Sequence, residues 1–362
     1  MSKNNVNTNK KKKSLGRTLV RFLCIILGLI LGVFLYFYIK LGRTYIYIPT
    51  VSSEEYATLE LKAGESLTGG DVTSAWKDGG HTRVFFDPKH PIIEVKQKDP
   101  DIENILVYGI DSRKVSDYKC RTDSMIIVTI NKRDNTVKLT SLMRDIGVYI
   151  GDTDATAGKK LKKLNSAYVY GGVGLMINTI NRTFDLDIQR FVMLDFTSAA
   201  AVIDLCGGVD ITVSADEVKY ANEFIDYQNK WTGSKSPKIS SSGRQTLNGV
   251  QAVAWSRIRY LDSDFVRTSR QRTIAQALIE KVGDMNYFEK IRLLEKSTGM
   301  FETNMQPKDL MRVGYYGAKG AHGLKQYRVP EDKMYTVQKN PWMMIIDFKE
   351  TNAKLHNFIW GK

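Results

Sequence analysis

The hydrophobic positions of the chain begin with one long run and continue as short runs between polar segments. The long run covers residues 22–39, 18 positions without a charged side chain. As a helix it would span about 27 Å, close to the ~30 Å hydrocarbon core of a bilayer. Aromatic residues gather at its far end, at 36–38, where interfacial aromatics are usual in membrane helices. The pattern predicts a transmembrane helix over residues 22–39.

The charges on either side of this run predict its orientation. Residues 1–21 carry seven Lys or Arg and no acid. Because the basic flank of a membrane helix stays inside, we expect a cytoplasmic tail at 1–21 and an extracellular domain after about Lys40. The alternative, a cleaved signal peptide, needs a shorter apolar run and an A-x-A-like site, which residues 41–45 do not offer. We therefore expect a single-pass protein of the cell membrane.

The short hydrophobic runs define the rest of the chain. Residues 40–100 are irregular and rich in Gly-Gly pairs and prolines, so we expect a juxtamembrane stalk or a small accessory region there. Beyond them, the pattern predicts a strand at 105–110, a hairpin of 124–131 and 136–142, a helical region at 165–184 broken near Gly171-Gly172, a strand at 191–194, a helix at 197–205, a strand at 209–213, and helices at 266–282 and 288–296. Strands that alternate with helices predict an α/β fold, or α+β sandwich, with a central mixed sheet flanked by helices. No linker is visible, so we expect one extracellular catalytic domain over 101–362.

Composition agrees with a folded exterior domain and limits its partners. A chain of 362 residues with 43% hydrophobic positions is neither disordered nor collagen-like. Its net charge is +14, and +7 remains outside the tail (46 basic against 39 acidic residues). Such a charge favours a polyanionic partner: nucleic acid, anionic lipid or a phosphate-rich substrate. A domain outside the membrane does not meet the genome, so we expect no nucleic acid.

Three cysteines are too few for a disulfide scaffold. Cys24 lies in the predicted membrane span, whereas Cys120 and Cys206 are exterior. Nothing in the sequence brings these two together, and two unpaired thiols is the simpler interpretation.

Arginines and aspartates recur together in the predicted loops. They occur as Asp111 with Arg113, Arg121 with Asp123, Arg144 with Asp145, and a later group of Arg257, Arg259, Asp264, Arg267 and Gln271. Arginine presents a planar fork that grips phosphate oxygens in two places and stays charged at any relevant pH. Converging arginines would therefore suit a pyrophosphate.

The carboxylates among these arginines allow two interpretations. A hard cation such as Mg²⁺ binds one or two carboxylates together with phosphate oxygens, so Asp111 and Asp123 could hold a metal beside a pyrophosphate. Alternatively, pairs such as Arg144 with Asp145 are surface salt bridges, which are common and contribute little energy. Spacing alone leaves both interpretations open, and the surface pairs are the simpler one.

Other catalytic signatures are missing from the sequence. The histidines are scattered, and neither H-E-x-x-H nor C-x-x-C occurs, which disfavours a zinc site. There is no G-x-S-x-G elbow and no phosphate-binding P-loop. The glycines at 171–174 lack the spacing of a dinucleotide fingerprint and indicate a loop before a helix.

A series of short motifs follows one order along the chain. They are residues 104–106, 109–113, 121–125, 141–145, 164–168, 170–172, 207–210, 247–249 with 251–252, 257–259 and 264–271. Together they resemble the LytR-CpsA-Psr family of Gram-positive envelope proteins from about residue 104 to residue 282. A short cytoplasmic tail and one membrane helix also fit this family.

The resemblance implies an activity and a set of site residues. Family members are phosphotransferases that move an anionic glycopolymer, of teichoic acid or capsular type, from undecaprenyl pyrophosphate to peptidoglycan as a phosphodiester. It implies Mg²⁺ (or Mn²⁺) on Asp111 and Asp123, and Asp264 close to the chemistry with Arg144, Arg259 and Arg267. It places around the pyrophosphate Arg113, Arg121, Arg144, Lys163, Arg257, Arg259, Arg267 and Gln271.

The chain also departs from the family pattern. Leu142-Met143 stands where Ile-Pro usually precedes Arg-Asp, Ile146 replaces a Thr, and Cys206 replaces a small residue. We expect an intact site with altered loop geometry. Two other functions stay open: capture of polyprenyl phosphates or glycopolymer without turnover, and hydrolysis of a lipid pyrophosphate. The sequence does not specify the glycopolymer, the acceptor glycan or the oligomeric state.

Overall fold

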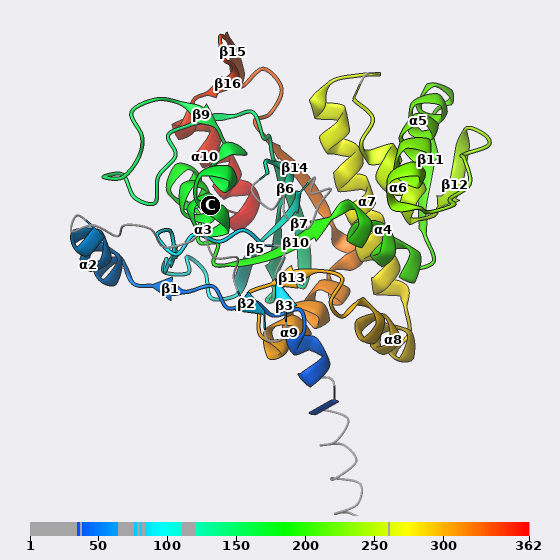
Figure 1. Cartoon of the computed structure of the whole chain (residues 1–362), viewed down its shortest axis with the longest axis horizontal. Helices are drawn as coiled ribbons and strands as arrows, with labels where there is room; N and C mark the ends of the chain where they lie inside the picture. The colour runs from blue at the N-terminus through cyan, green and yellow to red at the C-terminus, as the bar shows by residue number, and fades with distance from the viewer. Residues whose placement is uncertain are drawn as a thin grey trace, which may run out of the picture.

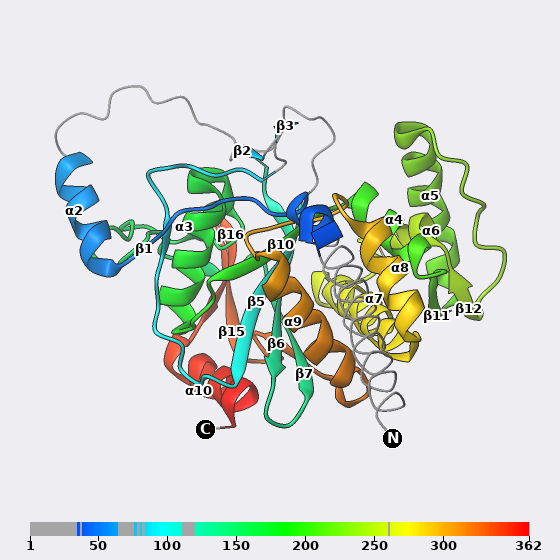
Figure 2. The same cartoon turned by 90° about the horizontal axis from the view of Figure 1, so that it is seen from below.

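A six-stranded mixed sheet forms the centre of the molecule, with helices on both faces (Figure 1, Figure 2). The computed structural model describes residues 35–36, 38–63, 76–77, 80–81, 84–110, 120–259 and 261–361. In sheet order the strands are β13 (Glu302–Thr303), β10 (Arg190–Asp195), β5 (Ile102–Ile110), β6 (Thr122–Asn131), β7 (Thr136–Leu142) and β14 (Lys325–Val329). β5, β6 and β7 are antiparallel to one another, β10 runs parallel to β5 and β14 runs parallel to β7, and the edge strand β13 is antiparallel to β10. This arrangement confirms the predicted α/β fold.

The central strands are buried on both faces. In β5, Leu106 and Tyr108 point into the main core, whereas Ile105 packs on the opposite face with Met305. Strands covered on both sides read as nearly continuous apolar runs, which is why the sequence revealed them. β6 and β7 form the predicted hairpin, with Ile126 opposite Ser141.

Helices cover the sheet in two layers, as the view in Figure 2 shows. α3 (Ser166–Phe184) and α10 (Phe348–Trp360) lie on one face, where the main core contains Phe184, Phe191 and Leu355. α7 (Asp264–Asp284) and α9 (Pro307–Lys319) cover the other face. The predicted helices at 165–184 and 266–282 are therefore α3 and α7.

The predicted break in α3 occurs where a segment from the N-terminal side crosses it. Gly171 and Gly172 have non-helical backbone, and the φ of Gly172 is 69°. The N–H of Val173 donates to the carbonyl oxygen of Phe85 at 3.0 Å. A Cβ at Gly172 would lie 2.4 Å from that oxygen, so the crossing requires glycine.

The described part of residues 40–100 packs on the domain that follows it. Tyr45 bridges to Thr303, and the side chains of Ile46, Phe85 and Ile92 belong to the main core. The short elements in this region are β1 (Thr50–Val51), α2 (Ser53–Ala63), β2 (Trp76–Lys77), β3 (Gly80–His81) and β4 (Ile92–Ile93). Of these, β1 pairs with β4 in parallel.

A second core lies beside the sheet and shares α7 with it (Figure 1). Buried Ile203, Ile225 and Trp255 pack there with Ile274 of α7. Its elements are α4 (Phe196–Leu205), β11 (Val209–Val213), α5 (Ala215–Thr232), β12 (Gly243–Leu247) and α6 (Gly249–Ser256). The hydrophobic pattern predicted α4 and β11, but neither α5 nor a separate core.

The remaining elements complete the domain. They are β8 (Gly147–Val148), β9 (Lys162–Lys163), α8 (Tyr287–Ser297), η1 (Ala321–Gly323), β15 (Tyr335–Lys339) and β16 (Trp342–Ile346). Cys206 is a buried free thiol, and no disulfide joins it to Cys120, in agreement with the simpler prediction.

The predicted membrane span falls largely outside the described residues, which include only 35, 36, 38 and 39 of it. Among the helices that the structure describes, none combines the length and the apolar character needed to cross a bilayer. The transmembrane helix stays a prediction from sequence.

Candidate functional site

The β6–β7 hairpin places Asp123 opposite Arg144. Ile126 pairs with Ser141, and three residues further toward the hairpin's open end on each side are Asp123 and Arg144. Nη1 of Arg144 donates to Oδ1 of Asp123 at 2.7 Å. Both side chains are mostly buried, so this pair is not one of the exposed salt bridges that the simpler interpretation expected.

The first turn of α7 adds a second acid and a second arginine. Nε of Arg267 donates to Oδ1 of Asp264 at 2.7 Å, and its Nη2 donates to the backbone carbonyl of Asp123 at 3.3 Å. Nη2 of Arg144 lies 3.3 Å from the same Oδ1 of Asp264. Because α7 crosses the sheet over β6 and β7, its N-terminus lies at the end of the sheet that carries Asp123.

Three more charged residues join this group. Nη2 of Arg259, in the loop before α7, donates to Oδ2 of Asp123 at 2.9 Å. Asp145 lies between Arg144 and Lys163, with its Oδ1 2.6 Å from Nζ of Lys163. We refer to the whole set as the arginine–aspartate cluster: Asp123, Arg144, Asp145, Lys163, Arg259, Asp264 and Arg267.

Burial and neighbouring charges act differently on the two inner arginines. Burial opposes the charge on Arg144, but Asp264, Asp123 and Asp145 outweigh it, so its pKa is raised. Arg267 is 2% exposed, and burial lowers its pKa despite the attraction of Asp264. Four basic groups meet three acids in the cluster, which leaves it attractive to an anion.

Comparison with known protein families shows to which family the domain that carries this cluster belongs. The model of the LytR_cpsA_psr family matches residues 72–357. The chain belongs to the LytR_cpsA_psr family.

Its curated relatives include two transferases from Bacillus subtilis (strain 168). The polyisoprenyl-teichoic acid–peptidoglycan teichoic acid transferase TagV is 31% identical over 60% of this chain and 53% of its own length. TagT, of the same name, is 29% identical over 68% of this chain and 78% of its own length. The chain thus spans about half the length of TagV.

A solved structure supports the fold of this family member. TagT with bound octaprenyl pyrophosphate lipid superposes with a TM-score of 0.53 and 23% identity. The alignment covers 74% of this chain and 94% of that chain. The likeness shows that the two domains share their fold.

The other predicted site residues lie around the cluster or outside the described residues. Arg121 is exposed and precedes β6, two positions before Asp123, and Gln271 is one turn beyond Arg267 on α7. Asp111 and Arg113 fall within residues 111–119, which the structure does not describe. The structure therefore brings together seven charged side chains, of which Asp145 was predicted only as part of a surface pair.

Arg257 packs against an aromatic ring at the end of α6. Its backbone is helical there, and its guanidinium lies 4.0 Å from the ring centre of Phe196. The contact of Arg257 with a pyrophosphate stays a prediction.

Arg270 supports the cluster from behind, a role that sequence reasoning missed. It is 4% exposed; its Nε donates to Glu217 at 2.7 Å, and its Nη1 donates to Asp262 at 3.2 Å. Nη1 also donates to the carbonyl oxygen of Ile258 at 3.4 Å, which fixes the loop that carries Arg259. Because Arg270 is three residues after Arg267, the sequence indicates that both lie on one side of a helix. It does not indicate the contact with Glu217, which is 53 residues away in the sequence.

The carboxylate oxygens of the cluster are the groups that could bind the predicted metal ion. Oδ2 of Asp264 is buried without a hydrogen-bond partner among the described residues. Both oxygens of Asp123 accept from arginines, and the described residues contain no set of three or more His, Cys, Asp or Glu that could hold a metal. A hard cation can take one or two carboxylates and complete its shell with phosphate oxygens, and Asp111, the second predicted carboxylate, lies outside the described residues.

Two hollows lie outside the cluster. The larger, about 730 Å³, includes Glu103, Arg190 and Arg312 at the opposite end of the sheet. The other, about 570 Å³, lies beside β9.

Proposed function

We propose that this protein is a phosphotransferase that moves an anionic glycopolymer from a polyprenyl pyrophosphate onto peptidoglycan as a phosphodiester. The observation that carries the proposal is the convergence of Arg144, Arg259 and Arg267 on Asp123 and Asp264 at one end of the sheet. The names of TagV and TagT and the lipid bound to TagT support it. The glycopolymer is of teichoic acid or capsular polysaccharide type.

The arginines would act by holding and neutralising the pyrophosphate. Arg144 and Arg267 are fixed by carboxylates, so they are oriented before substrate arrives, and Arg259 is the most exposed of the three. In the reaction, an acceptor hydroxyl forms a bond to the glycopolymer's phosphorus. The bond from that phosphorus to the bridging oxygen breaks, and the lipid leaves as its monophosphate, which carries away the proton lost by the acceptor hydroxyl. Such transfers depend mainly on positioning and charge stabilisation.

We propose Mg²⁺ (or Mn²⁺) as the cofactor, held by Asp123 with Asp111. When bound, the ion would supply positive charge to phosphate oxygens. We also propose that residues 22–39 anchor the domain at the outer face of the cell membrane, where a lipid-linked donor resides.

One experiment separates transfer from the two alternative functions. The full-length protein in lipid nanodiscs receives Mg²⁺, a radiolabelled polyprenyl-pyrophosphate glycan and a peptidoglycan oligomer. Label on the peptidoglycan supports transfer, and free phosphorylated glycan indicates a pyrophosphatase. Intact lipid that stays bound indicates capture without turnover. Either of the last two results would overturn the proposal.

A further inference from the structure

The hollow beside β9 is lined by basic side chains that the proposed reaction does not use. Its wall includes His90, Lys159, Lys160, Lys162 and Tyr170. The three lysines are exposed, and none has an ion-pair partner among the described residues. Three ammonium groups within four positions make this wall strongly attractive to anions.

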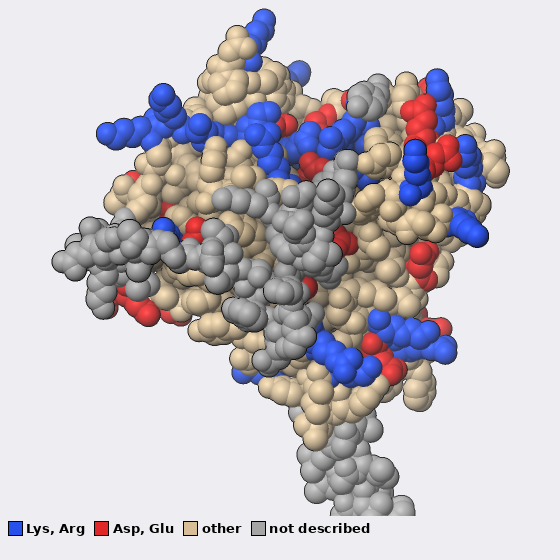
Figure 3. Space-filling view, in the orientation of Figure 1, with Lys and Arg blue, Asp and Glu red and all other residues tan. Residues whose placement is uncertain are grey.

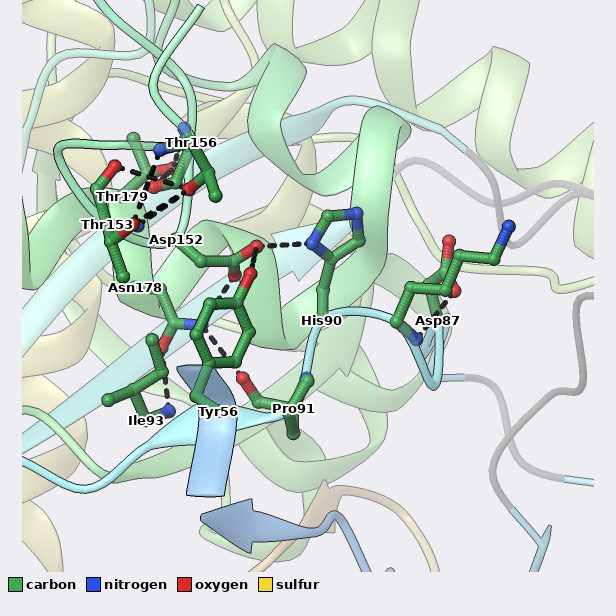
Figure 4. A network of polar contacts seen from close by, with 12 residues as sticks. Tyr56, Asp87, His90, Pro91, Ile93, Asp152, Thr153, Thr156, Asn178 and Thr179 are labelled. Atoms are coloured by element: carbon green, nitrogen blue, oxygen red, sulfur yellow. Dashed lines mark hydrogen bonds and ion pairs between the residues drawn. The ribbon is translucent and has the colours of Figure 1, made fainter. Parts of the chain in front are cut away.

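A buried carboxylate fixes His90 at the edge of this hollow (Figure 4). Nδ1 of His90 contacts Oδ2 of Asp152, whose side chain is 1% exposed. Asp152 also accepts from the hydroxyl of Tyr56 at 2.9 Å and from the side-chain amide of Asn178 at 2.7 Å. The carboxylate is therefore fully engaged, and the imidazole turns its Nε2 away from it. His90 presents a fixed donor rather than a mobile one.

The ionisation of His90 also favours its role as a hydrogen-bond donor. Burial lowers its pKa, but the hydrogen bond and the charge of Asp152 outweigh burial, so the pKa is raised above its ordinary value. A protonated imidazole donates from both nitrogens. The hollow thus combines one oriented imidazole, paired with Asp152, with three flexible ammonium groups.

The wall of the hollow is joined directly to the arginine–aspartate cluster. Lys162 and Lys163 are consecutive in β9, so they project to opposite faces. Lys163 reaches Asp145 of the cluster, while Lys162 lines the hollow. The N–H of Asn165 donates to the carbonyl oxygen of Arg144 at 3.1 Å, which ties this strand to the site.

The surface view agrees with this connection. Figure 3 shows Lys and Arg atoms in a band across the upper part of the molecule, from the segment around β9 toward the beginning of α7. Acidic atoms appear within the band near its middle. A chain with repeated negative charges could follow this band from one site to the other.

We propose that the hollow binds phosphate groups along the anionic glycopolymer, at least one repeat unit away from the pyrophosphate in the cluster. The inference rests on the proposed function, because it takes its ligand from that substrate. Flexible lysines suit a polymer whose phosphates recur, since each ammonium is a point charge that can adjust to its spacing. Isolated carboxylates, such as those of peptidoglycan stems, would engage one of the four cations at a time.

The test measures binding of a soluble poly(glycerol phosphate) oligomer, without lipid or pyrophosphate, to the full-length protein in detergent. A variant with K159Q, K160Q and K162Q should bind at least tenfold more weakly and show a smaller salt dependence. The matched control, K235Q with K308Q and K325Q, removes the same charge from exposed lysines elsewhere and should bind within twofold of wild type. Equal affinity of wild type and the first variant would overturn the inference. So would a loss confined to a peptidoglycan oligomer used as a second probe.

A transfer assay separates this inference from the proposed function. With a donor that carries a single sugar, the lysine variant should transfer at the wild-type rate. With a long anionic polymer its KM should rise about tenfold. If wild type transfers neither donor but binds the oligomer through the lysines, the proposed function fails and the binding site stands. If wild type transfers both and the lysine variant matches it throughout, the binding site fails alone.

Discussion

Nη1 of Arg144 lies 2.7 Å from Oδ1 of Asp123, directly across the open end of the β6–β7 hairpin. This contact is set by strand register, since a shift of either strand by one residue would turn its side chain to the other face, away from its partner. Arg259 then reaches the other oxygen of Asp123 from a position 136 residues away. One carboxylate therefore connects the hairpin with the segment that leads into α7.

Arg259 and Arg267 differ in burial, which predicts different effects of their removal. Arg259 has a side chain 42% exposed, so R259A should change the free energy of unfolding by less than about 1 kcal/mol. Transfer should fall by about 10²–10³-fold, because a group positioned on the developing charge is lost. R267A should instead destabilise the fold by about 3–5 kcal/mol, since it removes a buried guanidinium and leaves Asp264 with only the longer contact to Arg144. Denaturant unfolding and initial transfer rates check both; a stable R267A would contradict the assignment of Arg267 as a buried ion-pair partner.

Asp123 is the described residue predicted to hold the metal, so D123N should remove the dependence of transfer on Mg²⁺. Its rate should fall about 100-fold at saturating Mg²⁺ and change little on addition of a chelator. The control is D101N, because Asp101 pairs with Arg133 at the surface, and it should titrate with Mg²⁺ as wild type does. A D123N variant with an unchanged Mg²⁺ titration would rule out this ligand.

Removal of Arg270 should lower the stability of the fold. R270A leaves Glu217 and Asp262 without their partner and should cost about 3–5 kcal/mol of unfolding free energy. R270K restores the charge without the planar fork and should recover part of the loss. Urea unfolding monitored by tryptophan fluorescence measures both, because Trp255 lies in the second core. Equal stability of R270A and wild type would show that the loop before α7 is held by other contacts.

The hollow beside β9 should lose affinity for anions as pH rises. The raised pKa of His90 means that its charge, and the stability it contributes through Asp152, are fully present below the unfolded value of about 6.5. Both decline as pH rises through the higher folded pKa. Asp152 and Asp87 favour the charged form and Lys89 opposes it, while Tyr56 contacts Asp152. Binding of the glycerol-phosphate oligomer between pH 5.5 and about 9 measures the effect, and H90Q should lack the decline. A decline of equal size in H90Q would assign it to another group.

Gly172 should tolerate alanine far less than Gly233, because its backbone (φ 69°, ψ −159°) lies in a region that is essentially restricted to glycine, whereas Gly233 (φ 72°, ψ 10°) is left-handed. G233A meets nothing within 4 Å and should cost about 1–2 kcal/mol for left-handed backbone alone. G172A adds a contact of 2.4 Å with the carbonyl oxygen of Phe85, so its cost should exceed that of G233A by at least about 1–3 kcal/mol. Thermal or denaturant unfolding of the two variants gives the difference. Equal losses of unfolding free energy in the two variants would mean that the segment around Phe85 can move away from α3 at little energetic cost.

The local sequence pattern predicted those helices and strands whose apolar residues stand out clearly from the polar segments around them. β5 and the β6–β7 hairpin were visible as short apolar runs between polar segments, and α3 and α7 as longer helical patterns. α5 was missed although it begins with a capping box of Ser214 and Glu217, a signal that lies in capping rather than in periodicity.

The sequence by itself determined the strands and helices, the net positive charge and the residues that resemble the family, because these depend on neighbours within a few positions. It could not determine that Arg259 and Arg267 meet Asp123 across 136 and 144 residues. Those contacts exist because α7 packs across the sheet with its first turn over the end of β6, a relation between distant segments that no local period encodes. The basic hollow beside β9 is likewise a product of tertiary structure, since His90 and Lys162 line it from different parts of the chain.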